Sequence, residues 1–310
     1  MESIREAFLL FSQNKVREVP KLRLNTSTEV DGDSGITSSA SWIAAEEKSL
    51  YGCKVLASRA ANPAMGIPRT QGVLILFNPK TFAPICIMDA SLINAVRTGA
   101  ISALAARSLC PENSSNIGLI GAGVQMRTQL IGLSKVLKNI KEARVFSRGD
   151  SKNKFANEMS GEIGVPVIPV ESIGDALDSS SVIVIAAADD CDPLINKELV
   201  ARKGMTLISL GHHDVPTSLL GKMNRVITDS LEHTKSRAGH VITKAINEGI
   251  IQESNVGELG SILSGAMAGR NSSEENIFFC PSGMAFADLQ LANLAYHVAS
   301  QKGLGTSLHL

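Results

Sequence analysis

Residues 116–126 read NIGLIGAGVQM, an apolar run that passes directly into two glycines separated by one residue. Asn116–Ile120 is predicted to be a buried strand, and a helix is predicted to follow the glycines. Gly121 and Gly123 occupy the first two positions of a GxGxxG fingerprint, in which a pyrophosphate rests on the amino end of the helix. Met126 stands where the third glycine would be, so a tight turn without a ligand is the alternative interpretation.

The chain after Pro111 alternates short apolar runs with helical segments, which is typical of a doubly wound parallel sheet, or Rossmann domain. Further strands are predicted at Ala143–Phe146, Pro166–Val170, Val182–Ala187 and Met205–Leu210. Because the glycine turn follows the first strand of this series, we favour the interpretation that it binds a pyrophosphate. We assign residues 113–285 to a dinucleotide-binding domain of the α/β class.

The residues before this domain show a strand–turn–strand pattern instead. Strands are predicted at Lys54–Ser58, Gly72–Phe77 and Ile85–Met88, and helices at Ser91–Cys110 and Met284–Gln301. Runs of this kind, divided by Asn-Pro and Ala-Pro turns, are typical of an antiparallel sheet. Residues 1–112 and 286–310 are therefore predicted to form an α+β substrate-binding and dimerisation domain.

The composition limits the classes of partner. The chain has 310 residues, with 30 Lys and Arg against 30 Asp and Glu, so a zero net charge argues against nucleic acid or an anionic membrane as a partner. Met1–Phe11 is predicted to be an amphipathic helix without the features of a signal peptide, which predicts a cytoplasmic protein. The five cysteines are scattered and show no zinc-binding spacing, so we expect reduced, buried thiols and no metal.

The second Rossmann strand ends at Phe146, followed by Ser147 and Arg148, where an NAD-preferring domain carries Asp or Glu for the ribose hydroxyls. Arg148, with Ser147 and Ser151 nearby, can accommodate a 2′-phosphate, so these residues favour NADP(H). Alternatively, Arg148 is a solvated loop charge or stacks on the adenine.

Short motifs from both predicted domains are spread over nearly the whole chain. They are GCKV at 52–55, NP at 62–63, MDASL at 88–92, RTGA at 97–100, GAGVQ at 121–125, GELG at 257–260, GR at 269–270 and GMA with DL at 283–289. In this order they resemble the ornithine cyclodeaminase/mu-crystallin family. The resemblance implies a soluble nicotinamide-dependent protein that pairs into a homodimer through its antiparallel domain.

Within that family, four features resemble the branch that makes 2,3-diaminopropionate by oxidising N-(2-amino-2-carboxyethyl)-L-glutamate and releasing 2-oxoglutarate. These features are MDASLI at 88–93, CPSGMA at 280–285, where cyclodeaminases carry a serine near the position of Pro281, GLGTSL at 303–308, and Arg69 in place of the cyclodeaminases' threonine. An added guanidinium suits a substrate with extra carboxylates, although loop solvation is the alternative for Arg69. The branch implies NAD, whereas Arg148 favours NADP(H).

By motif position, the resemblance implies that Lys54 and Arg97 bind the substrate carboxylate, and that Lys54 and Asp214 are catalytic. Asp214 follows the strand Met205–Leu210, at the sheet edge where ligands bind in open α/β folds. The alternatives are that Lys54 is an exposed strand lysine, that Arg97 forms a salt bridge on the helix surface, and that Asp214 caps the turn before Pro216.

The cofactor contacts are also assigned by resemblance and by the glycine turn. The predicted contacts are Thr98, Gly121, Gly123, Val124, Gln125, Ser147, Arg148, Ala187, Gly283 and Met284. His212 and His213 could tune Asp214 or shuttle protons, but adjacent histidines after a strand are more often structural.

The leading hypothesis is an NAD(P)-dependent oxidoreductase that cleaves an N-substituted amino acid such as N-(2-amino-2-carboxyethyl)-L-glutamate. Within the same class, the alternatives are an ornithine cyclodeaminase and an imine or opine reductase. A mu-crystallin-like protein that binds NADPH and a small ligand is the alternative from another class. The presence of Lys54, Arg97 and Asp214 together favours an enzyme. A homodimer is expected, because strands Gly72–Phe77 and Ile85–Met88 otherwise leave an unprotected edge.

Overall fold

The computed structural model describes residues 1–26, 34–44, 49–187 and 203–308. They divide into two compact units, Thr98–Gly283 with Met1, and Glu2–Arg97 with Met284–Leu310. The first division lies inside helix α2 (Ser91–Leu109), between Arg97 and Thr98, whereas the sequence pattern places a boundary after residue 112. The carboxyl-terminal half of α2 belongs with the Thr98–Gly283 unit because it packs on helix α3 (Val124–Val136). A Cβ on Gly99 would lie 2.3 Å from the Thr128 carbonyl oxygen.

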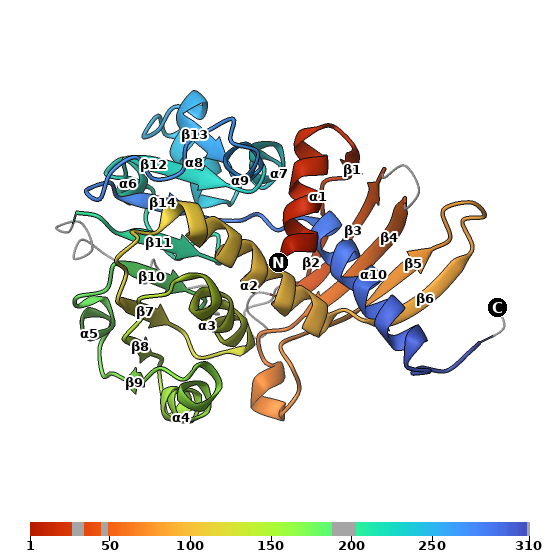
Figure 1. Cartoon of the computed structure of the whole chain (residues 1–310), viewed down its shortest axis with the longest axis horizontal. Coiled ribbons are helices and arrows are strands. Elements are labelled where there is room, and N and C mark those ends of the chain that lie inside the picture. The colour runs from red at the N-terminus through yellow and green to blue at the C-terminus, as the bar shows by residue number, and fades with distance from the viewer. Residues whose placement is uncertain (27–33, 45–48, 188–202, 309–310) are drawn as a thin grey trace. The chain divides into compact units, whose positions relative to one another are not determined.

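The Thr98–Gly283 unit is built on an eight-stranded parallel sheet with the order β13-β12-β14-β11-β10-β7-β8-β9 (Figure 1). Its strands are β7 (Asn116–Ile120), β8 (Glu142–Phe146), β9 (Val167–Pro169), β10 (Val182–Ile185), β11 (Thr206–Ser209), β12 (Arg225–Thr228), β13 (Val256–Glu258) and β14 (Ile277–Phe279). The order β9-β8-β7-β10-β11 is that of a Rossmann fold, with its switch point between β7 and β10. The predicted parallel sheet is confirmed.

Short helices connect these strands. Besides α3, they are α4 (Ser151–Ile163), α5 (Ile173–Leu177), α6 (Thr217–Leu220), α7 (Leu231–Lys235), α8 (Val241–Asn247), α9 (Leu259–Leu263) and the 3-10 helix η3 (Glu253–Asn255). All four residues of β10 and of β11 are buried, as expected for strands covered on both faces. None of the helices in the described ranges is both long and apolar enough to cross a lipid bilayer.

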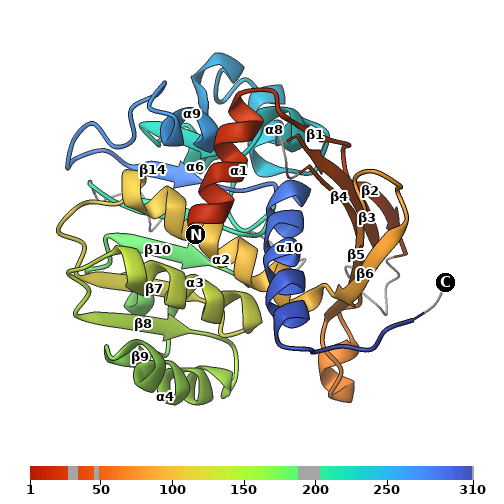
Figure 2. The ribbon, with the colours of Figure 1, turned by 45° about the vertical axis from the view of Figure 1, so that its right-hand side comes forward.

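The other unit contains a six-stranded antiparallel sheet with the order β1-β3-β4-β5-β6, in which β2 also pairs with β3. Its elements are α1 (Glu2–Ser12), β1 (Val16–Glu18), β2 (Leu22–Asn25), β3 (Gly35–Ile43), β4 (Leu50–Ser58), η1 (Asn62–Met65), β5 (Thr70–Phe77), β6 (Pro84–Asp89) and α10 (Ala285–Gln301). Figures 1 and 2 show α10 running across the sheet beside α1, and α10 contacts β3 and β4. The antiparallel sheet is confirmed.

The cysteines only partly match the expectation. Cys110 and Cys280 are buried, but Cys53 on β4 and Cys86 on β6 are half-buried. All four are free thiols, and Cys191 lies outside the described residues. Cys53 lies on the uncovered face of the sheet and Cys86 lies on its edge strand, which explains their partial exposure.

Candidate functional site

A polar cluster joins three elements of the antiparallel unit. The carboxylate of Asp288 on α10 accepts a hydrogen bond from Lys54 Nζ at 2.5 Å and another from Arg97 Nε at 3.1 Å. Asn94 Oδ1 accepts from the same two cations, at 3.0 Å from Lys54 Nζ and 2.8 Å from Arg97 Nη2. The structure therefore brings Lys54 and Arg97 together, through Asp288 and Asn94, to which the sequence analysis gave no role.

Asp288 reaches Lys54 because a glycine lets the helix approach the strand. Gly52 and Lys54 are two residues apart on β4 and so share one face of the sheet. A Cβ on Gly52 would lie 2.5 Å from Leu289 Cδ1 and 2.8 Å from the carbonyl oxygen of Ile75, so a larger residue would compete with the Leu289 side chain for this space. Asp288 immediately precedes Leu289 and is thus placed over Lys54.

The cluster retains unused hydrogen-bond donors and a net charge. An ammonium has three N–H groups and a guanidinium has five. Lys54 and Arg97 each use two N–H groups within the cluster. One N–H group of Lys54 and three of Arg97 remain. Two cations and one carboxylate leave one net positive charge. This arrangement suits the binding of one further carboxylate.

Burial and charge together set the ionisation of this cluster. Lys54 and Asp288 are 5% and 1% exposed. Burial lowers the pKa of Lys54 to about 8, although Asp288 opposes the change. Burial alone would raise the pKa of Asp288, but Arg97 and Lys54 hold it below its usual range. Asp288 is therefore a permanent anion, and the charge of Lys54 can change near pH 8.

Glu18 at the end of β1 caps the helix that carries Asp288. Its carboxylate accepts the backbone N–H of Ala285 at 2.7 Å and that of Phe286 at 2.9 Å. Burial raises the pKa of Glu18 to about 7, although these two hydrogen bonds lower it. The amino end of α10 is thus held by a side chain 267 residues earlier in the chain, a contact that no local pattern predicts.

In the parallel unit, Asp214 lies just beyond the carboxyl end of β11. Its Oδ2 accepts a hydrogen bond from Ser209 Oγ at 2.9 Å and from the backbone N–H of Gly211 at 2.8 Å. Burial raises the pKa of Asp214 to about 6, although both hydrogen bonds lower it. A carboxyl group that titrates near pH 6 can accept and return a proton under physiological conditions.

A second carboxylate, Asp229, holds the loop that contains Gly283. It follows β12, and its oxygens accept hydrogen bonds from Ser282 N at 2.8 Å, Ser282 Oγ at 2.6 Å and Gly283 N at 2.7 Å. Gly283 has a φ of +81°, which a larger residue would adopt only with strain. Because β12, β14 and β11 are neighbours, Asp229, this loop and Asp214 share one edge of the sheet. The sequence analysis missed Asp229.

His212, His240 and Cys280 lie close enough for a metal, with one ligand atom from each within 4.8 Å of the others. A neutral imidazole has one lone-pair nitrogen. His240 Nδ1 accepts the N–H of Ile242 at 3.2 Å, and His212 Nε2 accepts from Arg237. Both lone pairs are therefore used within the protein, and these residues do not fit a metal.

The glycine turn fits a pyrophosphate. Gly121 has a φ of +112°, and a Cβ there would lie 2.5 Å from the carbonyl oxygen of Ala186, which follows β10. Gly123 is the N-cap of α3, and among the described residues no side chain caps the helix and nothing lies within 4 Å of an added Cβ. The N–H groups at this helix end are thus accessible to an anion at the switch point of the sheet.

The remaining predicted cofactor residues lie near the same sheet edge or on α2. Ser147 and Ser151 are 2.8 Å apart through their hydroxyls, and Arg148 is exposed beside them. Ala187 follows β10, Val124 and Gln125 begin α3, Thr98 is buried on α2, and Met284 precedes α10. Their contacts with a cofactor stay predictions.

Arg69 lies directly before β5 in the antiparallel unit and is half-buried. Its carbonyl oxygen accepts the N–H of Arg59 at 2.9 Å. Its proposed role with a substrate carboxylate stays a prediction.

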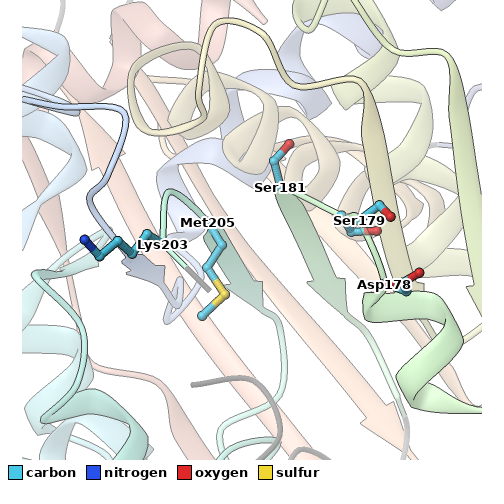
Figure 3. Close-up of a pocket in the computed structure, with 6 residues that line it drawn as sticks. Asp178, Ser179, Ser181, Lys203 and Met205 are labelled. Carbon is cyan, nitrogen blue, oxygen red and sulfur yellow. The ribbon is translucent and has the colours of Figure 1, made fainter. Parts of the chain in front are cut away.

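A cavity of about 440 Å³ lies at the opposite edge of the parallel sheet (Figure 3). Ser181 and Met205, which line it, immediately precede β10 and β11. Lys203, another lining residue, pairs with Glu274 at 3.4 Å. Ligands of Rossmann folds bind at the carboxyl ends of the strands, so this cavity at the amino ends is not the expected cofactor site.

The chain matches known proteins over almost all of its length. The model of the Ornithine cyclodeaminase/mu-crystallin family matches residues 1–303. Alanine dehydrogenase of Archaeoglobus fulgidus is 28% identical, over 99% of this chain and 92% of that protein. N-((2S)-2-amino-2-carboxyethyl)-L-glutamate dehydrogenase of Staphylococcus aureus is also 28% identical, over 85% of this chain and 79% of that protein.

The fold agrees with a solved structure of Thermococcus litoralis Delta(1)-pyrroline-2-carboxylate reductase in complex with NADH and L-proline. That structure matches with a TM-score of 0.89 and 30% identity, and the alignment covers 99% of this chain and 94% of the other. The motifs, both sheets and the extent of these matches agree. The chain therefore belongs to the ornithine cyclodeaminase/mu-crystallin family.

Proposed function

We propose that this protein is a nicotinamide-dependent oxidoreductase that acts at the C–N bond of an amino acid or imino acid. The observation that carries the proposal is the cluster around Asp288, in which Lys54 and Arg97 keep unused donors and one net positive charge. A substrate carboxylate would take these donors. Relatives that are dehydrogenases and reductases of amino and imino acids support the same class.

Each residue has a separate task in this proposal. Arg97 and Lys54 bind the carboxylate, the former through a planar fork and the latter as a point charge. Asp214 takes a proton from the substrate amine during oxidation and assists the attack of water on the resulting imine. The nicotinamide, when bound, accepts or supplies the hydride.

For the substrate, we propose N-(2-amino-2-carboxyethyl)-L-glutamate, cleaved to 2,3-diaminopropionate and 2-oxoglutarate. The similarity to the Staphylococcus aureus dehydrogenase supports this choice, as does Arg69 as a cation for an additional carboxylate. A second candidate is the reduction of a cyclic imino acid. It is favoured by the single net charge of the cluster, which balances one carboxylate, and by the similarity to the Thermococcus litoralis reductase.

The test is a screen of hydride transfer in both directions. Reduction of NAD⁺ and NADP⁺ would be followed with N-(2-amino-2-carboxyethyl)-L-glutamate, alanine, proline, ornithine and lysine, and oxidation of NADH and NADPH with Δ1-pyrroline-2-carboxylate. Mass spectrometry identifies the products. Net reduction with release of 2-oxoglutarate supports the first candidate, whereas ornithine turnover without net reduction indicates a cyclodeaminase.

Variants check that the turnover depends on the proposed residues. Asp214→Asn keeps the shape but removes the base, so turnover should fall roughly 100-fold while cofactor binding survives. Lys54→Ala and Arg97→Ala should weaken substrate affinity as well, by about 2 kcal/mol each. Tight NADPH binding without turnover of any substrate would favour a binding protein instead.

We also propose a homodimer that forms through the uncovered face of the antiparallel sheet. Cross-strand partners share a face, so the strand register places one set of exposed apolar side chains on the face opposite Lys54. These are Leu22, Leu24, Ile36, Val55, Val73 and Ile87. An exposed apolar patch of this kind marks an interface. A relative described as an archaeal alanine dehydrogenase dimer supports the proposal.

A further inference from the structure

Ser39 lies next to the cluster around Asp288 but contributes nothing to it within the protein. It is on β3, directly opposite Lys54 in the strand register, so both side chains point to the face covered by α10. Ser39 is 4% exposed, and its hydroxyl makes no hydrogen bond within the described part of the chain.

An unsatisfied buried hydroxyl destabilises a folded protein, so its presence needs an explanation. A small cavity of about 10 Å³ lies beside it, lined among others by Ser39, Lys54 and Asp288. The cavity has room for about one polar atom. The hydroxyl therefore faces a space that a single atom of a ligand can fill.

The next serine on the same face shows that the strand does not force this arrangement. Ser41 is two residues further along β3, opposite Gly52, and is also buried. Its hydroxyl donates to the carbonyl oxygen of Arg17 at 3.4 Å. Of these two serines, only the one opposite Lys54 lacks a partner among the residues that the structure describes.

We propose that the Ser39 hydroxyl donates a hydrogen bond to the substrate carboxylate, to the oxygen that also accepts the unused N–H of Lys54. This inference rests on the proposed function. A carboxylate oxygen has two lone pairs and can accept both donors, while Arg97 binds the other oxygen. The substrate carboxylate loses its hydrogen bonds to water when it binds, so it needs donors from the protein. The carboxylate of Asp288 can only accept hydrogen bonds and cannot supply one. Ser39 is thus a binding residue for substrate.

The experiment measures amino-acid binding and apo stability in parallel. L-proline, L-alanine and N-(2-amino-2-carboxyethyl)-L-glutamate are titrated calorimetrically into protein saturated with NADH, a combination in which no hydride transfer can occur. The proteins are the wild type, Ser39→Ala, Ser41→Ala and Lys54→Ala. Thermal unfolding of each without ligand gives the stability readout.

The inference predicts opposite results for the two serines. Ser39→Ala should weaken binding roughly 10-fold, as expected for one hydrogen bond to a charged group, and should leave the melting temperature unchanged or higher. Ser41→Ala should leave binding within about twofold and lower the melting temperature, because it breaks a hydrogen bond within the protein. Kinetically, Ser39→Ala should raise KM and spare kcat.

The outcomes distinguish a failure of the role of Ser39 from a failure of the proposed function. Unchanged binding in Ser39→Ala, with binding lost in Lys54→Ala, would overturn the role of Ser39 and leave the carboxylate site standing. Equal binding by Lys54→Ala and the wild type, or no binding of any of the three amino acids by the wild type, would count against the proposed function itself.

Discussion

Asp288 holds Lys54 at 2.5 Å across 234 residues of sequence, and both side chains are almost completely buried. The same carboxylate binds Arg97, so one anion orients two cations. A buried ion pair contributes little net stability when intact, but removing one partner leaves an uncompensated charge. Asp288 is therefore a positioning residue whose loss should affect stability and substrate binding together.

For Asp288→Asn, we expect the free energy of unfolding to fall by about 3 kcal/mol and KM to rise, because two buried cations lose their anion. Urea unfolding and steady-state kinetics measure the two effects. Glu253→Gln is the matched control. It breaks an exposed pair with Lys235, and pairs of this kind contribute less than about 1 kcal/mol. A loss of stability no larger than in the control would contradict the role of Asp288.

The oxidative reaction should have a bell-shaped dependence of kcat/KM on pH. Asp214 must be ionised to act as a base, so activity falls as the pH decreases through about 6, its pKa. Lys54 must be protonated to bind the carboxylate, so activity also falls as the pH rises through about 8. In Lys54→Arg, the alkaline limb should move to higher pH, because a guanidinium stays charged. An alkaline limb unchanged in that variant would assign it to another group.

Arg148 should determine how the protein distinguishes the two nicotinamide cofactors. In Arg148→Ala, NADP⁺ binding should weaken roughly 10-fold and NAD⁺ binding less than twofold, because only the 2′-phosphate loses a partner. Calorimetric titration with both cofactors gives the ratio of their dissociation constants. Arg144→Ala is the control: it lies on β8, shortly before Arg148, and pairs with Glu142 at 2.8 Å, and it should leave this ratio unchanged. An equal loss for both cofactors would mean that Arg148 does not contact the phosphate.

The uncovered sheet face should be required for self-association. Ile87 on β6 is 56% exposed, so Ile87→Asp should change little in the monomer but place a charge in the dimer interface. Light scattering at micromolar concentration should show a dimer for the wild type and a monomer for the variant. Ile168→Asp, on the parallel sheet, is the control and should remain dimeric. A monomeric wild type would contradict the proposal directly.

The elements that the sequence predicted well are those with strong local patterns. Asn116–Ile120 was predicted to the residue, because an apolar run with β-branched residues ends at two glycines. Strand β3, by contrast, was not predicted. Its sequence, GITSSASWI, places serines on the buried face and so lacks the usual alternation of apolar and polar residues. Ser39 was missed with it.

The candidate site was predicted in part for a similar reason. Lys54, Arg97 and Asp214 were found through family motifs, which mark residues without showing what they contact. Asp288 lies within an apolar helix, and its importance depends on Gly52, far away in the sequence. Contacts that arise from the packing of a helix on a strand have no local signature.

Burial of Glu18 adds proton uptake to the folding of this protein. Its pKa rises from 4.5 to about 7 on burial, so the folded chain holds a proton between these values that the unfolded chain releases. The stability from this proton is fully present below pH 4.5 and is lost as the pH rises through about 7. Refolding of the wild type near neutrality should therefore take up more protons than refolding of Glu18→Gln, whose side chain has the same shape but cannot titrate.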